Sequence, residues 1–177
     1  FFFISIFIQK YSELHESGNR ETTQQRDGYV FSRLKEFIGD PLLHHIIRED
    51  LERYKAHRRR SVKPVTINLE LRVIQSLFNR AKDWGYLKAS PADGVKKFKL
   101  DEKEPRFLKP EEGRALMDSA EGQMRGFIVT ALNTGLRKGE LFILKWSDVD
   151  FERREVRVRR SKGKRFRVIP MNKLLIE

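Results

Sequence analysis

The segment from Ala131 to Asp150 contains the residues best suited to chemistry. It reads ALNTGLRKGELFILKWSDVD. Arg137 follows Gly135, a residue that permits a tight turn, so its guanidinium is expected at the start of a helix. A planar guanidinium can hold two oxygens of one phosphodiester and stabilise the negative charge that develops on them during reaction. Glu140 lies three residues further on, on the same helix face, and could orient Arg137.

Each of these two residues also has a simpler interpretation. Arg137 could be a surface arginine that caps a helix or pairs with Glu140, as many exposed arginines do. Glu140 could be a solvated carboxylate, because such pairs three residues apart are common on helix surfaces.

The composition excludes several classes of protein. The 177 residues contain no cysteine, which excludes a disulfide scaffold, a thiolate zinc site and a nucleophilic thiol. The net charge is +12, and it is concentrated: residues 48–99 carry 14 basic and 6 acidic side chains, and residues 151–177 carry 10 and 3. Two separate basic blocks favour a polyanionic partner, and nucleic acid over a membrane, because neither block is a clean amphipathic helix.

The first hundred residues predict a small helical bundle. Apolar residues recur at helical spacing over residues 22–38, 50–60 and 64–84. The apolar run at residues 1–8 is too short to span a bilayer, and we expect it to begin a helix or strand that packs on the first helices.

The second half predicts a different organisation. Residues 88–106 lose periodicity and gather proline, glycine and charge, which indicates a linker with a boundary near Lys97. Helices are expected over residues 110–120, 124–133 and 136–145. Alternation then predicts a hairpin with Val156, Val158, Phe166 and Val168 on an apolar face and arginines on a cationic face. The fold class expected is mainly α with a small antiparallel β element.

The segment from Ala131 to Asp150 closely resembles the first conserved box of the tyrosine recombinases, the phage-integrase and Xer-like enzymes. The matching positions are Thr134, Gly135, Leu136, Arg137, Gly139, Glu140, Leu141, Leu144, Trp146, Asp148 and Asp150. The resemblance implies three parts: a SAM-like helical core-binding domain that binds DNA at residues 1–97, a linker at 98–106, and the N-terminal part of a truncated α+β catalytic domain at 107–177.

The resemblance also implies roles for individual residues. Arg137 takes the place of the catalytic arginine, with Glu140 behind it. The segment SKGKRFRVIP matches the strand, Lys-Gly turn and strand of the family, which assigns to Lys162 the general acid that protonates the departing 5′-oxygen, with Lys164 as the alternative. Neighbouring cations make proton loss from a lysine easier. A simpler interpretation is that both lysines only contact DNA phosphates.

A basic surface is expected to contact the DNA backbone with little regard for sequence. Leu69 stands where the family commonly has an arginine, and a merely solvated basic helix is the alternative interpretation. The residues expected at this surface are Lys55, Arg58, Arg59, Arg60, Lys63, Thr66, Asn68, Arg72, Lys164 and Arg165.

The expected function is that of a DNA-binding fragment of a site-specific recombinase, which in full-length form cuts and rejoins DNA through a phosphotyrosyl intermediate during integration of a mobile element. Family enzymes add a His-x-x-Arg box and a nucleophilic tyrosine, whereas every tyrosine and histidine here precedes residue 87. The chain alone is therefore expected to be inactive.

Two alternatives stay open: a non-catalytic relative that occupies or regulates recombination sites, and an unrelated basic regulator in which Arg137 and Lys162 lie far apart. The expected partner is double-stranded DNA, with self-association on DNA in the full-length protein. No metal or other cofactor, no membrane and a cytoplasmic location in a bacterial or phage-infected cell are expected.

Overall fold

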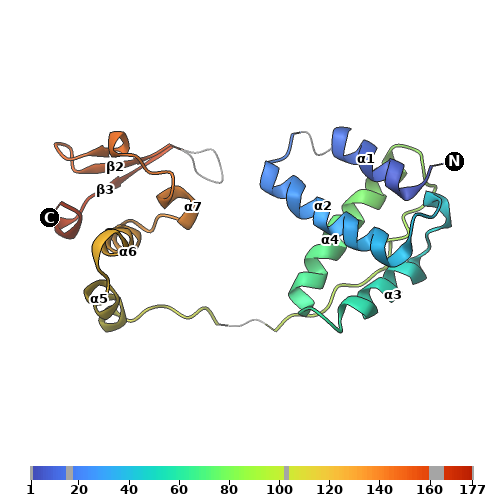
Figure 1. Cartoon of the computed structure of the whole chain (residues 1–177), viewed down its shortest axis with the longest axis horizontal. Coiled ribbons are helices and arrows are strands. Elements are labelled where there is room, and N and C mark those ends of the chain that lie inside the picture. The colour runs from blue at the N-terminus through green and yellow to red at the C-terminus, as the bar shows by residue number, and fades with distance from the viewer. Residues whose placement is uncertain (1, 15–17, 102–103, 160–165, 177) are drawn as a thin grey trace. The chain divides into compact units, whose positions relative to one another are not determined.

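The computed structural model describes residues 2–14, 18–101, 104–159 and 166–176. The chain divides into two compact units, Phe1–Lys103 and Glu104–Glu177, which we call unit 1 and unit 2. Helices dominate both units, and a three-stranded antiparallel sheet lies in unit 2 (Figure 1). The fold class is therefore the expected one. Among the described residues, no helix is long and apolar enough to cross a membrane.

Over its described residues, unit 1 is a bundle of four α-helices with one 3-10 turn. The apolar N-terminal run enters the first helix, which packs against both the second and the fourth (Figure 1). The elements are α1 (Ile4–Leu14), α2 (Glu21–Ile38), η1 (Leu43–His45), α3 (Arg48–Arg58) and α4 (Pro64–Asp83).

Helix α4 is the centre of this bundle. Pro64 occupies its first turn, where a missing N–H is tolerated and the fixed φ suits a helix. Apolar residues then recur at three- and four-residue steps, and the side chains from Ile67 to Ala81 on this stripe are buried among α1, α2 and α3. Gly85 follows the helix with φ of 77°, a conformation that favours glycine.

Unit 2 combines short helices with the sheet. Helix α5 packs on α6, and α6 packs on α7 and α8. Within the described ranges 104–159 and 166–176, the small core consists of Leu136, Leu141 and Val158, with four partly buried neighbours. The elements are α5 (Pro110–Asp118), α6 (Gly122–Thr134), α7 (Lys138–Leu141), η2 (Trp146–Asp148), β1 (Val149–Asp150), β2 (Glu155–Val158), β3 (Arg167–Pro170) and α8 (Lys173–Ile176).

The helix expected over residues 136–145 is much shorter in the structure. Arg137 has extended backbone angles, φ −68° and ψ 151°, and serves as the N-cap of α7. The helix ends after one turn, and the chain continues into the 3-10 turn η2. Phe142 and Ile143, expected on a helix, lie exposed between these two turns. The apolar spacing over residues 136–145 therefore did not predict the length of the helix. Two separate short turns form in its place, and each turn closes its own backbone hydrogen bonds.

The residues of β3 that point to the inner face of the sheet differ from those expected from the sequence. Val156 pairs with Ile169, and Val158 pairs with Arg167, so these four residues share one face. Val156 and Val158 are buried, which makes this the inner face. Phe166 and Val168, expected on the apolar face, have side chains that are 62% and 41% exposed. Its pairing with Val158 places Arg167 on the inner face, where a buried carboxylate, described below, receives its guanidinium.

Candidate functional site

Arg137 is positioned by the turn that separates α6 from α7. Gly135 ends α6 in the left-handed conformation, with φ of 62°, and its N–H donates to the carbonyl of Ala131 at 3.0 Å. Leu136 is then buried in the small core, which anchors the chain directly before Arg137. A residue other than glycine at position 135 would be strained in this conformation. The turn therefore fixes where the Arg137 side chain leaves the backbone.

Glu140 is the buried centre of the site. Its side chain is 5% exposed and accepts four hydrogen bonds from the described part of the chain. The backbone N–H of Arg137 donates to Oε2 at 3.0 Å, and Arg137 Nη1 donates to Oε1 at 3.2 Å. Arg167 donates through Nη1 to Oε1 at 3.2 Å and through Nη2 to Oε2 at 2.7 Å. The hydrogen bonds from Arg167 and from the Arg137 backbone lower the pKa of Glu140 to about 2, so the carboxylate stays charged at neutral pH.

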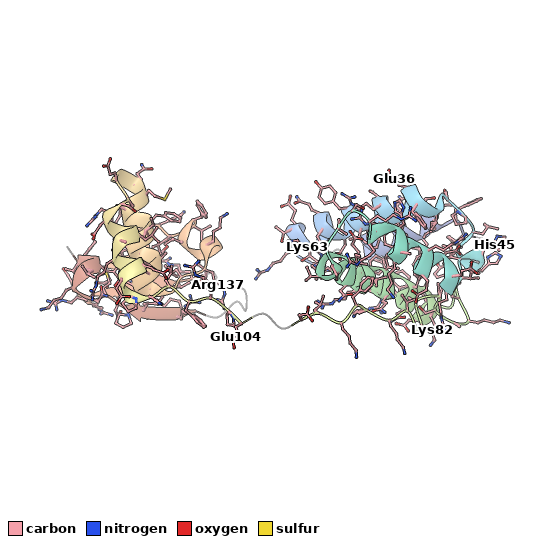
Figure 2. All side chains as sticks on the ribbon, turned by 90° about the horizontal axis from the view of Figure 1, so that it is seen from below. Glu36, His45, Lys63, Lys82, Glu104 and Arg137 are labelled. Atoms are coloured by element: carbon pink, nitrogen blue, oxygen red, sulfur yellow. The ribbon has the colours of Figure 1, made fainter. Side chains whose placement is uncertain are left out.

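Arg137 itself remains largely open. Its side chain is 65% exposed at the surface of unit 2 (Figure 2). Among the described residues, Glu140 is its one side-chain partner, and that bond uses one of the five guanidinium N–H groups. The remaining donors can reach an anionic oxygen. The arrangement suits a guanidinium that is aimed by a carboxylate and stabilises charge on a phosphodiester.

The other predicted catalytic residue is a lysine that follows β2 in the sequence. Lys162, its alternative Lys164, and Arg165 lie outside the described residues. Strand β2 ends before them, at Val158, and strand β3 begins after them, at Arg167.

Two further acidic residues of the Ala131–Asp150 segment, Asp148 and Asp150, pair with arginines within β2 or directly after it. Asp148 pairs with Arg159 at 2.6 Å between Oδ1 and Nε, and Asp150 pairs with Arg157 at 2.6 Å between Oδ2 and Nη2. These contacts attach the segment to β2 and neutralise two arginines of the face that was expected to be cationic.

Arg58, expected at the DNA surface, is directed into the core of unit 1. Its side chain is buried between α3 and α4, where Nε and Nη2 donate to Glu70 at 2.9 and 2.7 Å. Tyr54 donates its hydroxyl to the same carboxylate at 2.9 Å. Burial raises the pKa of the Tyr54 phenol, so the group stays a neutral donor. The structure thus gives Arg58 a structural role, because a buried carboxylate requires a cationic partner.

Asn68 is also engaged inside unit 1. Its Nδ2 donates to the carbonyl of Phe98 at 2.9 Å, and its Oδ1 accepts the N–H of Phe98 at 2.8 Å. The Phe98 ring lies 5.0 Å from Lys55 Nζ, a cation–π distance. The chain is therefore held against α3 and α4 as far as Phe98, one residue beyond the boundary expected near Lys97.

The remaining basic residues of unit 1 stay at its surface. Lys63, at the N-cap of α4, is exposed (Figure 2), as are Arg59, Arg60 and Arg72. Thr66 and Lys55 are half-buried, and Lys55 pairs with Glu52 at 3.2 Å. Arg59, Arg60 and Lys63 are neighbours in sequence at the junction of α3 and α4, and the Arg59 guanidinium also lies 6.0 Å from the centroid of the Phe98 ring.

Two residues of consequence were not singled out from the sequence. Arg167 joins the carboxylate that holds Arg137, and Phe98 covers Lys55. The strand register could have indicated Arg167, because a residue opposite the buried Val158 must point inward, but the alternation of Phe166 and Val168 pointed to the other face.

Both units match models of one protein family. Residues 4–99 match the model described as "Phage integrase, N-terminal domain", and residues 106–177 match the model described as "Phage integrase family". A protein of Haemophilus influenzae named putative integrase/recombinase is 28% identical over 168 residues, covering 85% of this chain and 54% of that protein. Prophage integrase IntR of Escherichia coli is 38% identical over 96 residues, covering 54% of this chain and 23% of IntR. The chain thus spans about half the length of the Haemophilus relative, and less of IntR.

Solved structures show the same fold. A lambda integrase dimer bound to a COC′ core site superposes with a TM-score of 0.82 at 19% identity, covering 96% of this chain and 49% of the neighbour. The Tn1549 transposon integrase in complex with a circular intermediate DNA gives a TM-score of 0.77 at 22% identity, covering 96% and 61%. The family models cover more than half of the chain and extend across both units, so the protein belongs to the phage integrase family of tyrosine recombinases.

Proposed function

We propose that this chain is the DNA-binding part of a site-specific recombinase, in which Arg137 contacts the phosphodiester that the whole enzyme cuts and rejoins. The observation that carries the proposal is the exposed Arg137 guanidinium, held from behind by the buried carboxylate of Glu140. An arginine fixed in this way can stabilise negative charge on non-bridging oxygens without reorganising at the moment of reaction.

The two units contribute differently to this function. Arg59, Arg60 and Lys63 supply phosphate contacts in unit 1 that are insensitive to sequence, together with Arg72 further along α4. Unit 2 supplies the contact to the reacting phosphate through Arg137, and Lys162 is the candidate proton donor to the leaving oxygen. Glu140 orients Arg137, with no metal or other cofactor in this scheme.

We further propose that the full-length protein assembles on double-stranded DNA. Related structures include a lambda integrase dimer bound to a core site and a lambda integrase tetramer bound to a Holliday junction. A protein that acts on chromosomal or phage DNA in this way works in the bacterial cytoplasm.

The proposal is tested by titrating a short fluorescein-labelled duplex with the purified chain at several potassium chloride concentrations. We expect binding whose affinity, on a logarithmic scale, falls linearly with the logarithm of salt, because each neutralised phosphate releases counterions. We also expect no denaturation-resistant protein–DNA adduct, since the four tyrosines lie at positions 11, 29, 54 and 86, all in unit 1. Affinity that does not change with salt would contradict the phosphate contacts, and a covalent adduct would contradict the second expectation.

A further inference from the structure

Two guanidinium groups share the carboxylate of Glu140, and they share it unequally. Arg167 makes two hydrogen bonds, one to each oxygen, at 3.2 and 2.7 Å. The Arg137 side chain makes one, at 3.2 Å. Paired bonds from a guanidinium to a carboxylate are stronger and more directional than a single bond. Glu140 is therefore bound mainly to Arg167, although Arg137 lies only three residues away on the same turn.

The position of Arg167 is fixed independently of this contact. It lies opposite Val158 in the β2–β3 ladder, on the inner face of the sheet, and its side chain is 34% exposed. Arg137, at 65%, is the more exposed member. Arg137, Glu140 and Arg167 together carry a net charge of +1. The positive charge that Glu140 leaves unpaired is that of Arg137, the arginine that faces solvent.

We propose that Arg167 is a positioning residue that keeps Arg137 available to DNA. By occupying both oxygens of Glu140, Arg167 prevents that carboxylate from closing into a two-bonded pair with Arg137. Glu140 then aims the Arg137 guanidinium through one bond without cancelling its charge. This inference rests on the proposed function, because it specifies how the phosphate-contacting arginine is kept open.

The physical reason lies in the burial of Glu140. A carboxylate that is 5% exposed is costly to leave without a cationic partner. If Arg167 were absent, Arg137 would be the cation best placed to satisfy it, and its fork geometry would allow paired bonds. Arg137 would then be drawn into a neutral pair, and its hydrogen-bond donors would turn away from a phosphate.

The test is the salt dependence of duplex binding by the full chain and its variants, with the same fluorescein-labelled duplex. Arg137→Gln is expected to lower the slope of log affinity against log salt by about one, the value for one lost phosphate contact. Arg167→Gln is expected to lower it by about the same amount, although Arg167 does not touch the DNA. Adding Glu140→Gln to Arg167→Gln is expected to restore the slope, because the competing charge is gone and Arg137 is free again.

Two further variants separate this mechanism from a general loss of charge or of folding. Arg153→Gln removes an exposed arginine of unit 2 whose side chain makes no ion pair among the described residues, and it should change the slope much less. Arg167→Lys keeps the net charge but offers Glu140 a single ammonium in place of a forked guanidinium. We therefore expect it to lower the slope in part, because Arg137 is partly drawn away from the phosphate. Adding Glu140→Gln should restore the slope. If circular dichroism shows that Arg167→Gln does not fold, Arg167→Lys, which keeps the net charge, decides between the positioning role and a general loss of charge.

The contrary outcomes are distinct. An unchanged slope in Arg167→Gln and in Arg167→Lys, with a lowered slope in Arg137→Gln, overturns the positioning role and leaves the proposed function in place. A lowered slope in Arg167→Gln that Glu140→Gln does not restore shows that Arg167 contacts DNA itself, which also overturns it. An unchanged slope in Arg137→Gln overturns both the proposed contact and this inference.

Discussion

At Glu70, a single buried carboxylate links two helices. It accepts hydrogen bonds from Tyr54 and Arg58 of α3 and is itself part of α4. The bonds to Arg58 involve both carboxylate oxygens, and all three side chains are buried. Removing one member of such a buried ion pair leaves the other charge without compensation.

We therefore expect Glu70→Ala to lower the free energy of unfolding of unit 1 by about 3 to 5 kcal/mol. Urea unfolding followed by circular dichroism checks this value. Glu36→Ala, at an exposed position of α2 (Figure 2), is the control and should stay within about 0.5 kcal/mol of the parent. Equal effects of the two substitutions would show that the network is not stabilising.

Glu140 gives a pH dependence with a defined sign. Its pKa falls from an ordinary value of 4.5 to about 2 in the folded chain, chiefly because of the bonds from Arg167. A lowered pKa means that the folded state binds protons less readily than the unfolded state. The contribution of Glu140 is thus complete above its ordinary value and is lost as the pH falls toward about 2.

The expected result is that the stability difference between the parent chain and Glu140→Gln narrows as the pH is lowered from neutral toward about 2. Thermal unfolding at a series of pH values, followed by Trp146 fluorescence in a Trp84→Phe background, measures it for unit 2. A difference that stays constant over this range would mean that the carboxylate charge does not stabilise the unit.

At the level of elements, Asn68 fixes where the linker leaves the bundle. Both polar atoms of its side chain bond the backbone of Phe98, a residue thirty positions further on. The Asn68 side chain thus satisfies both the N–H and the carbonyl of Phe98, as a neighbouring backbone would in a sheet. Asn68, which the sequence suggested for DNA contact, anchors the chain instead.

Asn68→Ala is expected to release the segment around Phe98 and to speed trypsin cleavage at Lys96, Lys97 and Lys99, which are already exposed, because a protease needs a segment that can open locally. Loss of the two bonds leaves a backbone N–H and a carbonyl without partners, at a cost of about 1 to 3 kcal/mol. Limited proteolysis with mass spectrometry measures the cleavage rate at these lysines. Asn79→Ala, at an exposed position on the same helix, is the matched control. No acceleration relative to that control would argue against an anchoring role.

At the level of the whole molecule, the two units differ in how much core they bury. Among the residues that the structure describes, nineteen buried hydrophobic residues form the cluster of unit 1, whereas the cluster of unit 2 contains three. Unit 2 also exposes large apolar side chains, with Trp146 at 80%, Phe107 at 78% and Phe142 at 64%. Exposed apolar surface of this kind favours association with other apolar surfaces.

We expect two separate unfolding transitions, with unit 2 melting at the lower temperature because it buries less apolar area. Trp84→Phe leaves Trp146 to report on unit 2, and Trp146→Phe leaves Trp84 to report on unit 1. A hydrophobic dye should bind the native chain mainly through unit 2, and a fragment of residues 1–103 should bind it weakly. One coincident transition in both single-tryptophan variants would contradict this expectation.

The sequence by itself determined the family, the helical character of unit 1 and the turn that precedes Arg137. These features depend on local information: the stripe of α4, the stop at Gly85, and the Gly135 turn before Arg137 are properties of neighbouring residues. Tertiary structure decided the rest. The register of β2 on β3 turned Arg167 inward toward Glu140, and the packing of α3 on α4 buried Arg58 against Glu70. A charged residue in a sequence looks the same whether it meets solvent, DNA or a buried carboxylate, because only the residues brought close by folding determine its partner.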